Sequence, residues 1–299
     1  MTELAIRPLV EDEEHLFESL PDSGLVGQAA FGRSYRALAA QGEYRPHLTW
    51  VALRGDDVVA RAAWRATTHA GQPPALDWFD FIDFEAGVRL LRAAPMATQY
   101  HLALPPGWRN SPSTADAANA RIGAARVAGL LPLVERYGYR WTPDRGLPDR
   151  PGRLVFRPES DDAVVLDTFR RIHHGTLDAH ARRAAGDKGP EAAARKDLDI
   201  VNRMPRAREW LRLAYTPEGE PVGLMTTSWF REPLAGFAGV LPEHRGNGYS
   251  YDLLVEMMHL LVAEGAETII GNADTTNHPM VSALARAGWP IVELRIHLA

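Results

Sequence analysis

The feature that most constrains this chain is an internal echo between its two halves. Ile6-Arg7-Pro8, followed by an acidic pair, recurs as Phe156-Arg157-Pro158 with a second acidic pair, at an offset of 150 positions. A second match has the same offset: Arg136-Tyr137-Gly138-Tyr139 is similar to Arg286-Ala287-Gly288-Trp289. The first echo predicts a strand that turns into a helix, and the second predicts a helix that ends at a glycine before an aromatic residue. Two matches at one offset indicate a duplicated domain.

The duplication predicts two domains, 1–150 and 151–299, with the seam near Pro148 to Gly152. A chain of 299 residues is long enough for two cores. In each half, two apolar runs flank a turn-forming segment, which is typical of a hairpin. A third strand, a helix, another strand and another helix follow. This order predicts a mixed α/β fold, with a mostly antiparallel sheet and flanking helices, rather than a doubly wound sheet.

Composition narrows the classes of function. The net charge is −5, so no basic excess indicates a nucleic-acid partner or an anionic membrane. The chain has no cysteine, which excludes disulfides, thiolate metal sites and a cysteine nucleophile. No apolar run has the length of a signal peptide or a membrane span, so we expect a cytoplasmic protein. Heavy use of Ala, Arg, Gly and Pro is typical of a bacterial protein.

One loop carries the strongest chemical signal. Arg245 to Ser250, with the sequence RGNGYS, lies between a predicted strand that ends near Leu241 and a predicted helix from Tyr251 to Glu264. A strand-to-helix turn presents backbone N–H groups and the positive end of a helix dipole to an anion. Glycines let the backbone approach phosphate oxygens, and an arginine adds a charge-assisted donor. The loop therefore indicates a pyrophosphate site. It lacks the third glycine of a dinucleotide fold and the Gly-Lys of a Walker loop.

This loop resembles that of the GNAT superfamily of N-acetyltransferases. Arg245, Gly248 and Ser250 fill the signature positions, with Ser as a small departure at the last. Downstream, Asn277 and Met280, followed by Gly288-Trp289, resemble the asparagine-containing helix of that family. The resemblance is specific over roughly Leu234 to Trp289, and the order of elements extends it to two tandem GNAT-like domains.

The resemblance implies acetyl-coenzyme A, or another acyl-coenzyme A, as co-substrate, with no metal. The backbone N–H groups of the loop would hold the pyrophosphate, and the strand before it would pair with pantetheine. A backbone N–H near Val240 or Leu241 would stabilise the oxyanion. Asn277 would hydrogen-bond the pantetheine arm. The residues implied in coenzyme binding are Ala238, Val240, Leu241, Arg245, Gly246, Asn247, Gly248, Tyr249, Ser250 and Asn277.

Acyl transfer to an amine needs a base and an acid, and the sequence offers candidates for both. An ammonium must lose a proton before it attacks a thioester. Glu232 and Asp274 are the candidate bases, although a solvated turn carboxylate and a helix-capping aspartate are the respective structural alternatives. Leu284 stands where many GNAT enzymes have a tyrosine acid, so Tyr249 or Tyr251, or water, would protonate the thiolate.

The acceptor site is expected on the helix that contains His173 and His174, together with Asp178. Their spacing allows one helical face, with a plain surface face as the alternative. These residues offer no third metal ligand.

The first half departs from the family pattern, because Asp83 to Val88 replaces the glycine loop and brings two acids. Acidic side chains there would repel a pyrophosphate. We therefore expect a degenerate first domain that supports the second.

The functional hypothesis is an N-acyltransferase acting on a primary amine of a small molecule, amino acid or peptide. A non-catalytic coenzyme A-binding or scaffold protein, a thioester hydrolase and an O-acyltransferase are the alternatives. Either a monomer or a homodimer is compatible with the sequence.

Overall fold

A computed structural model describes residues 3–21, 34–65, 74–95, 99–229 and 232–299. It divides into two compact units, Met1–Arg136 with Glu293–Ala299, and Tyr137–Val292. Both units combine a mostly antiparallel sheet with flanking helices, which confirms the predicted fold class.

The first unit is built on the strand order β1-β2-β3-β4-β5-β12, in which only β4 and β5 are parallel. Its elements are β1 (Leu4–Pro8), α1 (Glu14–Glu18), α2 (Tyr35–Ala40), β2 (Thr49–Arg54), β3 (Asp57–Arg65), β4 (Ala75–Phe81), α3 (Phe84–Ala93), β5 (Tyr100–Leu104), α4 (Pro112–Val127) and most of β12 (Ile291–Leu298).

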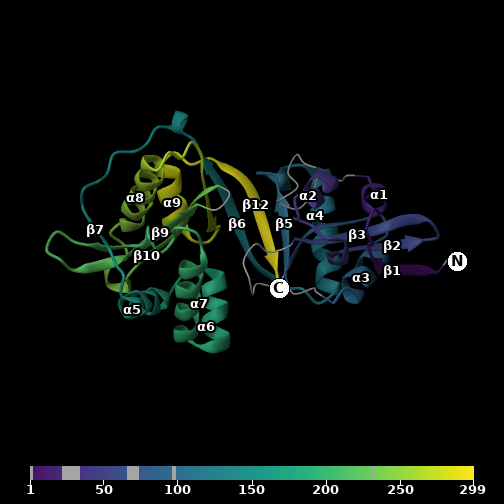
Figure 1. Cartoon of the computed structure of the whole chain (residues 1–299), viewed down its shortest axis with the longest axis horizontal. Coiled ribbons are helices and arrows are strands. Elements are labelled where there is room, and N and C mark those ends of the chain that lie inside the picture. Colours follow the sequence, from purple (N-terminus) through teal and green to yellow (C-terminus); the bar gives the residue numbers. More distant parts are fainter. Residues whose placement is uncertain (1–2, 22–33, 66–73, 96–98, 230–231) are drawn as a thin grey trace. The chain divides into compact units, whose positions relative to one another are not determined.

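The second unit repeats this plan with the strand order β7-β8-β9-β10-β11-β6, in which β10 and β11 are parallel (Figure 1). Its elements are the second part of β6 (Pro132–Trp141), β7 (Val155–Pro158), α5 (Asp162–His173), α6 (Ala179–Lys188), α7 (Pro190–Arg203), β8 (Arg212–Tyr215), β9 (Pro221–Trp229), β10 (Pro233–Val240), α8 (Tyr249–Ala263), β11 (Ile269–Asp274) and α9 (His278–Arg286).

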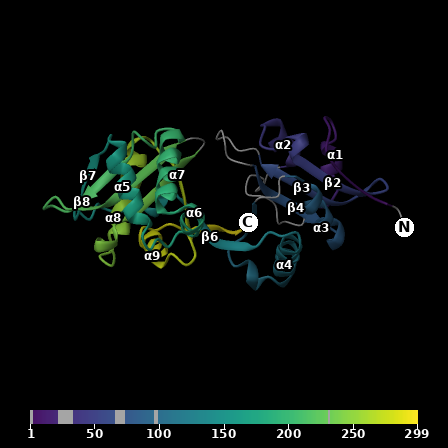
Figure 2. The same cartoon turned by 90° about the horizontal axis from the view of Figure 1, so that it is seen from below.

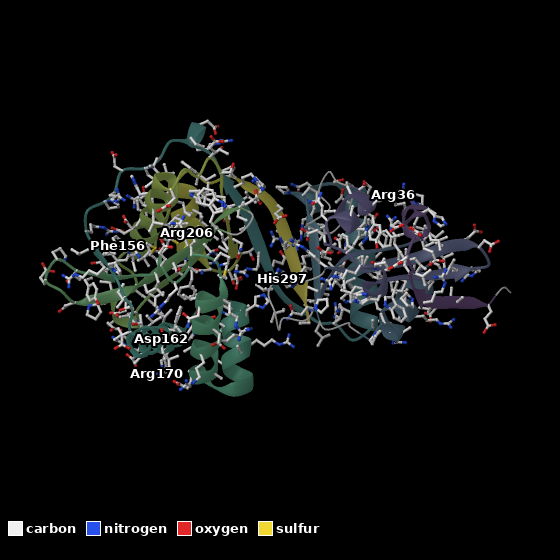
Figure 3. The ribbon with its side chains drawn as sticks, in the orientation of Figure 1. Arg36, Phe156, Asp162, Arg170, Arg206 and His297 are labelled. Atoms are coloured by element: carbon white, nitrogen blue, oxygen red, sulfur yellow. The ribbon has the colours of Figure 1, made fainter. Side chains whose placement is uncertain are left out.

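The last strand of each half belongs to the other unit. Residues Leu294–Leu298 of β12 pair with β5, and Figure 3 marks His297 on this strand. Tyr137–Trp141 of β6 lie next to β11 in the second unit. The compact units therefore exchange their terminal strands, whereas the sequence predicted an uninterrupted division near residue 150.

The helix end predicted for the first half of the second echo was wrong. The segment from Arg136 to Tyr139 lies in β6, not at the end of a helix. The preceding helix, α4, ends at Val127, and Gly129 then takes a left-handed φ of 107°. Tyr137, Tyr139 and Trp141 alternate as residues of a strand do, and this period outweighs the glycine between them. The match at Gly288, with a φ of 77° after α9, was predicted correctly.

Helices cover both faces of the second sheet. The apolar side of α8 and the helix α9 pack on one face, in a core that includes Leu254, Met258 and Trp289. Helices α5 and α7 pack on the other face, in a core around Phe169 and Leu224. Figure 1 shows the two helix layers on either side of β9 and β10, and Figure 2 shows α5 and α7 in front of the strands.

No helix in the described part of the chain is both long and apolar enough to cross a membrane.

Candidate functional site

Strands β10 and β11 separate early and leave one backbone edge open. Their pairing is confined to Leu234 opposite Ile270, whereas β10 pairs with β9 as far as Val240. The N–H of Leu241 donates to Val222 O at 2.8 Å, on the β9 side. Backbone groups alternate along an antiparallel strand, so those of Ala238 and Val240 face the open edge. The N–H groups of both residues and the carbonyl of Ala238 lie along this edge, but Val240 O accepts from Arg245 at 3.2 Å and the N–H of Leu241 is already used.

A β-bulge interrupts β10 just beyond the point where the strands separate. The register with β9 shifts between Ala235 and Phe237, so Gly236 is the extra residue. A bulge leaves backbone groups outside the ladder and is frequent beside active sites. Gly236 is exposed, and a Cβ there would lie 2.9 Å from Thr226 O, which explains why glycine fits.

The glycine loop ends at the uncapped N-terminus of α8. Gly246 and Gly248 have φ angles of 85° and 73°, in the region that favours glycine. Gly248 is the N-cap residue and has no side chain to accept a bond from the first turn of α8. The first N–H groups of a helix have no intrahelical acceptor and attract anions. The loop therefore offers exposed donors, as predicted.

The side chain of Arg245 has a different role from the one predicted. Its guanidinium donates to Ile172 O and His174 O, both at 2.7 Å, and to Val240 O at 3.2 Å. These bonds connect the end of α5 with the end of β10. Arg245 therefore fixes the loop relative to α5, and its guanidinium is not a spare donor for a phosphate.

Arg153 is a second arginine at the loop, and the sequence did not reveal it. Its guanidinium donates to Asn247 O at 3.0 Å and to Gly248 O at 3.4 Å, and it pairs with Asp252 in the first turn of α8. The hydrogen bond to Asp252 raises the pKa of Arg153. Because Arg153 binds the loop carbonyls, it supports the loop from the side opposite to its N–H groups. The sequence did offer one sign of such a partner: Asp252 is an acid among the apolar residues of the predicted helix, and the structure buries it.

The two predicted bases have other partners. Glu232 is half exposed, and its Oε1 accepts a 2.6 Å hydrogen bond from Arg140. Asp274 is buried at the end of β11, and its Oδ2 accepts the backbone N–H of Ala179, at the start of α6, at 2.7 Å. The alternative predicted for Asp274 was a turn or cap within its own segment, but its carboxylate instead accepts from the first turn of the distant helix α6, and Asn277 caps α9. Both carboxylates have structural contacts that compete with proton transfer.

The other predicted groups lie where the topology expects them. Asn277 is the N-cap of α9, and its Oδ1 accepts the N–H of Met280 at 3.4 Å, so the cap does not use its amide NH₂. Tyr249 is the first residue of α8, with the Arg153 guanidinium 5.1 Å from its ring centre. Leu284 is buried in the apolar core, so it supplies no acid.

A cavity of about 190 Å³ opens between α5, α7 and the strands β9 and β10. Its lining is mainly apolar and contains one acid, Asp197 of α7. The lining residues are Phe169, Asp197, Ile200, Val201, Met204, Ala207, Thr226, Thr227, Ser228, Leu234, Gly236 and Phe237. Leu234 and Gly236 place one end of the cavity where β10 leaves β11.

None of the three predicted acceptor residues is among those that line this cavity. His173 is buried, with its Nε2 2.9 Å from Oδ2 of Asp197; the angles are not those of a hydrogen bond, so this is a close polar contact. His174 is exposed, and Asp178 caps α6 by accepting the N–H of Ala181. The sequence missed Asp197, although it lies three residues after Ala194 and four before Val201, on the apolar face of α7.

In the described part of the first unit the strands separate in the same way, but side chains fill the edge that this leaves. Strands β4 and β5 pair only at Leu76 opposite Tyr100. Beyond that point, the buried guanidinium of Arg121 donates to Phe79 O at 2.9 Å and occupies the strand edge. Asp83 caps α3 by accepting the N–H of Ala86, which lowers the pKa of Asp83. The protein's own side chains therefore occupy the positions that correspond to the open edge and free helix end of the second unit.

Within the described residues, no group of three or more His, Asp or Glu side chains could hold a metal ion.

No family model matches the sequence. No curated protein matches it either.

Solved structures do match the fold. A tandem GNAT protein from the clavulanic acid biosynthesis pathway aligns over 99% of this chain and 98% of its own, with 16% identity and a TM-score of 0.53. A GCN5-related N-acetyltransferase from Sphaerobacter thermophilus covers 99% of this chain and 94% of its own, with 13% identity and a TM-score of 0.55. One from Kribbella flavida covers 91% and 95%, with 13% identity and a TM-score of 0.50. At such identities the matches show the fold.

Proposed function

The chain has the tandem GNAT fold, and from this premise we propose that its second unit is an acyl-coenzyme A-dependent N-acyltransferase. The observation that carries the proposal is a continuous set of open groups. These are the free edge of β10, the bulge at Gly236, the uncapped start of α8 and a cavity that reaches the bulge.

The dimensions of the strand fit a coenzyme that lies along it. The loop N–H groups from Gly246 to Ser250 would hold the pyrophosphate, and the backbone groups of Ala238 together with the N–H of Val240 would pair with pantetheine. Leu241 and Gly236 are five residues apart, or about 17 Å along a strand. This is comparable to an extended pantetheine arm, so the thioester would lie near the bulge, at the end of the cavity.

The chain's residues would then supply position and polarity. The acceptor ammonium enters from the cavity, gives a proton to water, and the free amine attacks the thioester carbonyl carbon. The C–N bond forms as the C–S bond breaks, and the second proton lost from the nitrogen passes through water to the leaving thiolate, which departs as the thiol. Backbone N–H groups at the bulge would stabilise the negative oxygen that develops. The apolar cavity excludes water, which limits hydrolysis of the thioester.

The first unit would not bind coenzyme, because Arg121 and Asp83 occupy the equivalent groups. The role of the first unit is structural in this proposal.

Thiol release tests the proposal. The intact chain is incubated with acetyl-coenzyme A, with and without pooled primary amines, and the acylated product is identified by mass spectrometry. Release that depends on an amine supports N-acyl transfer. Release without an amine would indicate a hydrolase, release with alcohols alone an O-acyltransferase, and tight binding without release a non-catalytic protein.

A further inference from the structure

The cavity beside β10 has a chemical character that identifies its occupant. One carboxylate, Asp197, is set among the apolar side chains of Phe169, Ile200, Val201 and Phe237. No cationic side chain lines the cavity among the residues that the structure describes. A lone anion in an apolar wall favours a ligand with a single positive charge on an apolar body.

Asp197 is held so that its carboxylate serves the cavity. Nε2 of the buried His173 lies 2.9 Å from Oδ2 of Asp197, and a quarter of the Asp197 side chain is exposed. The His173 ring lies nearly parallel to that of Phe169, with ring centres 6.5 Å apart, and Phe169 also packs against Phe237. The histidine thus supports the carboxylate from behind, while the cavity side of Asp197 stays accessible.

Asp197 is the charged group of the lining, and the other polar groups there are the neutral hydroxyls of β9. The Thr226 hydroxyl is committed to Ala207 O at 2.6 Å. Ser228 lies two residues further along β9, so its side chain faces the same side of the sheet as that of Thr226. Thr227, also in the lining, has a buried hydroxyl without a hydrogen-bond partner among the described residues. An ammonium near Asp197 therefore meets one charged group, with neutral hydroxyl groups beside it.

The size of the cavity limits the apolar body. An apolar cavity of about 150 Å³ holds benzene. The 190 Å³ here therefore suits a phenylethyl or hexyl group. An α-carboxylate on the same body would lie near Asp197 without a cation, and a second ammonium would lie in the apolar wall without an anion.

We propose that the acceptor is a primary monoamine with a compact apolar body and no carboxylate, whose ammonium group binds to Asp197. This inference rests on the proposed acyl transfer and names the acceptor class of the same site. The ammonium that binds Asp197 is converted to the free amine, by loss of its proton, before it attacks the thioester near Gly236.

Matched pairs of amines test the acceptor class. 2-Phenylethylamine is compared with phenylalanine, which adds an α-carboxylate, and hexylamine with 1,6-diaminohexane, which adds a second ammonium. We expect kcat/KM to be at least about 30-fold higher for the monoamine of each pair, since an unpaired charge in the cavity is costly. Equal or higher activity with phenylalanine or the diamine would overturn the assignment, while amine-dependent release would still support acyl transfer.

A variant of the anchor gives an independent readout. Asp197→Asn should lower kcat/KM for 2-phenylethylamine at least about 20-fold and should reduce the discrimination against phenylalanine, because the repulsion of its carboxylate is removed. Acetyl-coenzyme A affinity should be unchanged. Asp199→Asn is the matched control, since Asp199 is exposed on the same helix and pairs with Arg203. A fully active Asp197→Asn enzyme with unchanged selectivity would overturn the proposal; failure of every amine would overturn it together with the proposed function.

Discussion

Replacing Arg153 by alanine tests whether the coenzyme loop is held from behind. The change leaves the Asp252 carboxylate, whose side chain is 2% exposed, without its partner. Breaking a fully buried pair costs about 3–5 kcal/mol. The Arg153 side chain is 44% exposed, so solvent screening lowers the expected loss to about 2 kcal/mol. For a unit the size of Tyr137–Val292, that corresponds to a fall in Tm of about 4–8 °C.

The same change removes the hydrogen bonds that Arg153 donates to Asn247 O and Gly248 O. A typical hydrogen bond contributes about 1 kcal/mol, so we expect acetyl-coenzyme A affinity to fall about fivefold. Thermal unfolding and titration calorimetry measure the two effects.

A double variant separates the charge effect from the loop effect. Arg153→Ala with Asp252→Asn should recover most of the lost stability, because no buried charge is left unpaired. Its coenzyme affinity should stay low, because the loop carbonyls still lack their donor. A double variant as unstable as Arg153→Ala, or either variant with wild-type affinity, would refute this account of the loop.

Three further changes probe separate parts of the fold. Gly246→Asp should weaken acetyl-coenzyme A binding about 30-fold relative to Gly246→Asn, because both side chains tolerate a positive φ but only aspartate repels a pyrophosphate. Calorimetry measures both affinities, and equal values would mean that the anion binds elsewhere. Burial raises the pKa of Tyr35 to about 12, so the stability due to its neutral form is complete below pH 10 and is lost as the pH rises through about 12. Tyr35→Phe should therefore make the free energy of unfolding in urea less dependent on pH in that window. An unchanged dependence would contradict the assignment. Gly223→Ala should unfold the second unit, since its Cβ would lie 2.0 Å from Gly239 O. Gly186→Ala is the control, because the space around its Cβ is open. A Gly223→Ala protein with wild-type Tm would show that the strands can separate there.

The sequence predicted features that depend on neighbouring residues. The hairpins, the third strand of the second half and the helix after the loop lie within two residues of their expected positions. The third strand of the first half, expected at Leu76 to Phe84, ends three residues earlier, at Phe81. Glycines with positive φ at Gly246, Gly248 and Gly288 follow from local backbone geometry, which a single residue can signal.

Features that depend on distant contacts could not be predicted. The exchange of β6 and β12 between units leaves no local pattern, because a strand has the same alternation whichever sheet receives it. Asp197 resembled one charge among many on α7 until the fold placed it beside a cavity. Glu232 and Asp274 had suitable positions along the chain, but their partners Arg140 and Ala179 are far away in sequence.

The central claim is that one coenzyme site exists, in the second unit. Titration calorimetry of the intact chain with acetyl-coenzyme A measures the number of sites directly. The structure predicts one site per chain, because Asp83 and Arg121 fill the equivalent positions in the first unit. It also predicts that Gly246→Asp strongly weakens binding at that site. Two equivalent sites, or one site that the loop variant leaves intact, would contradict the claim.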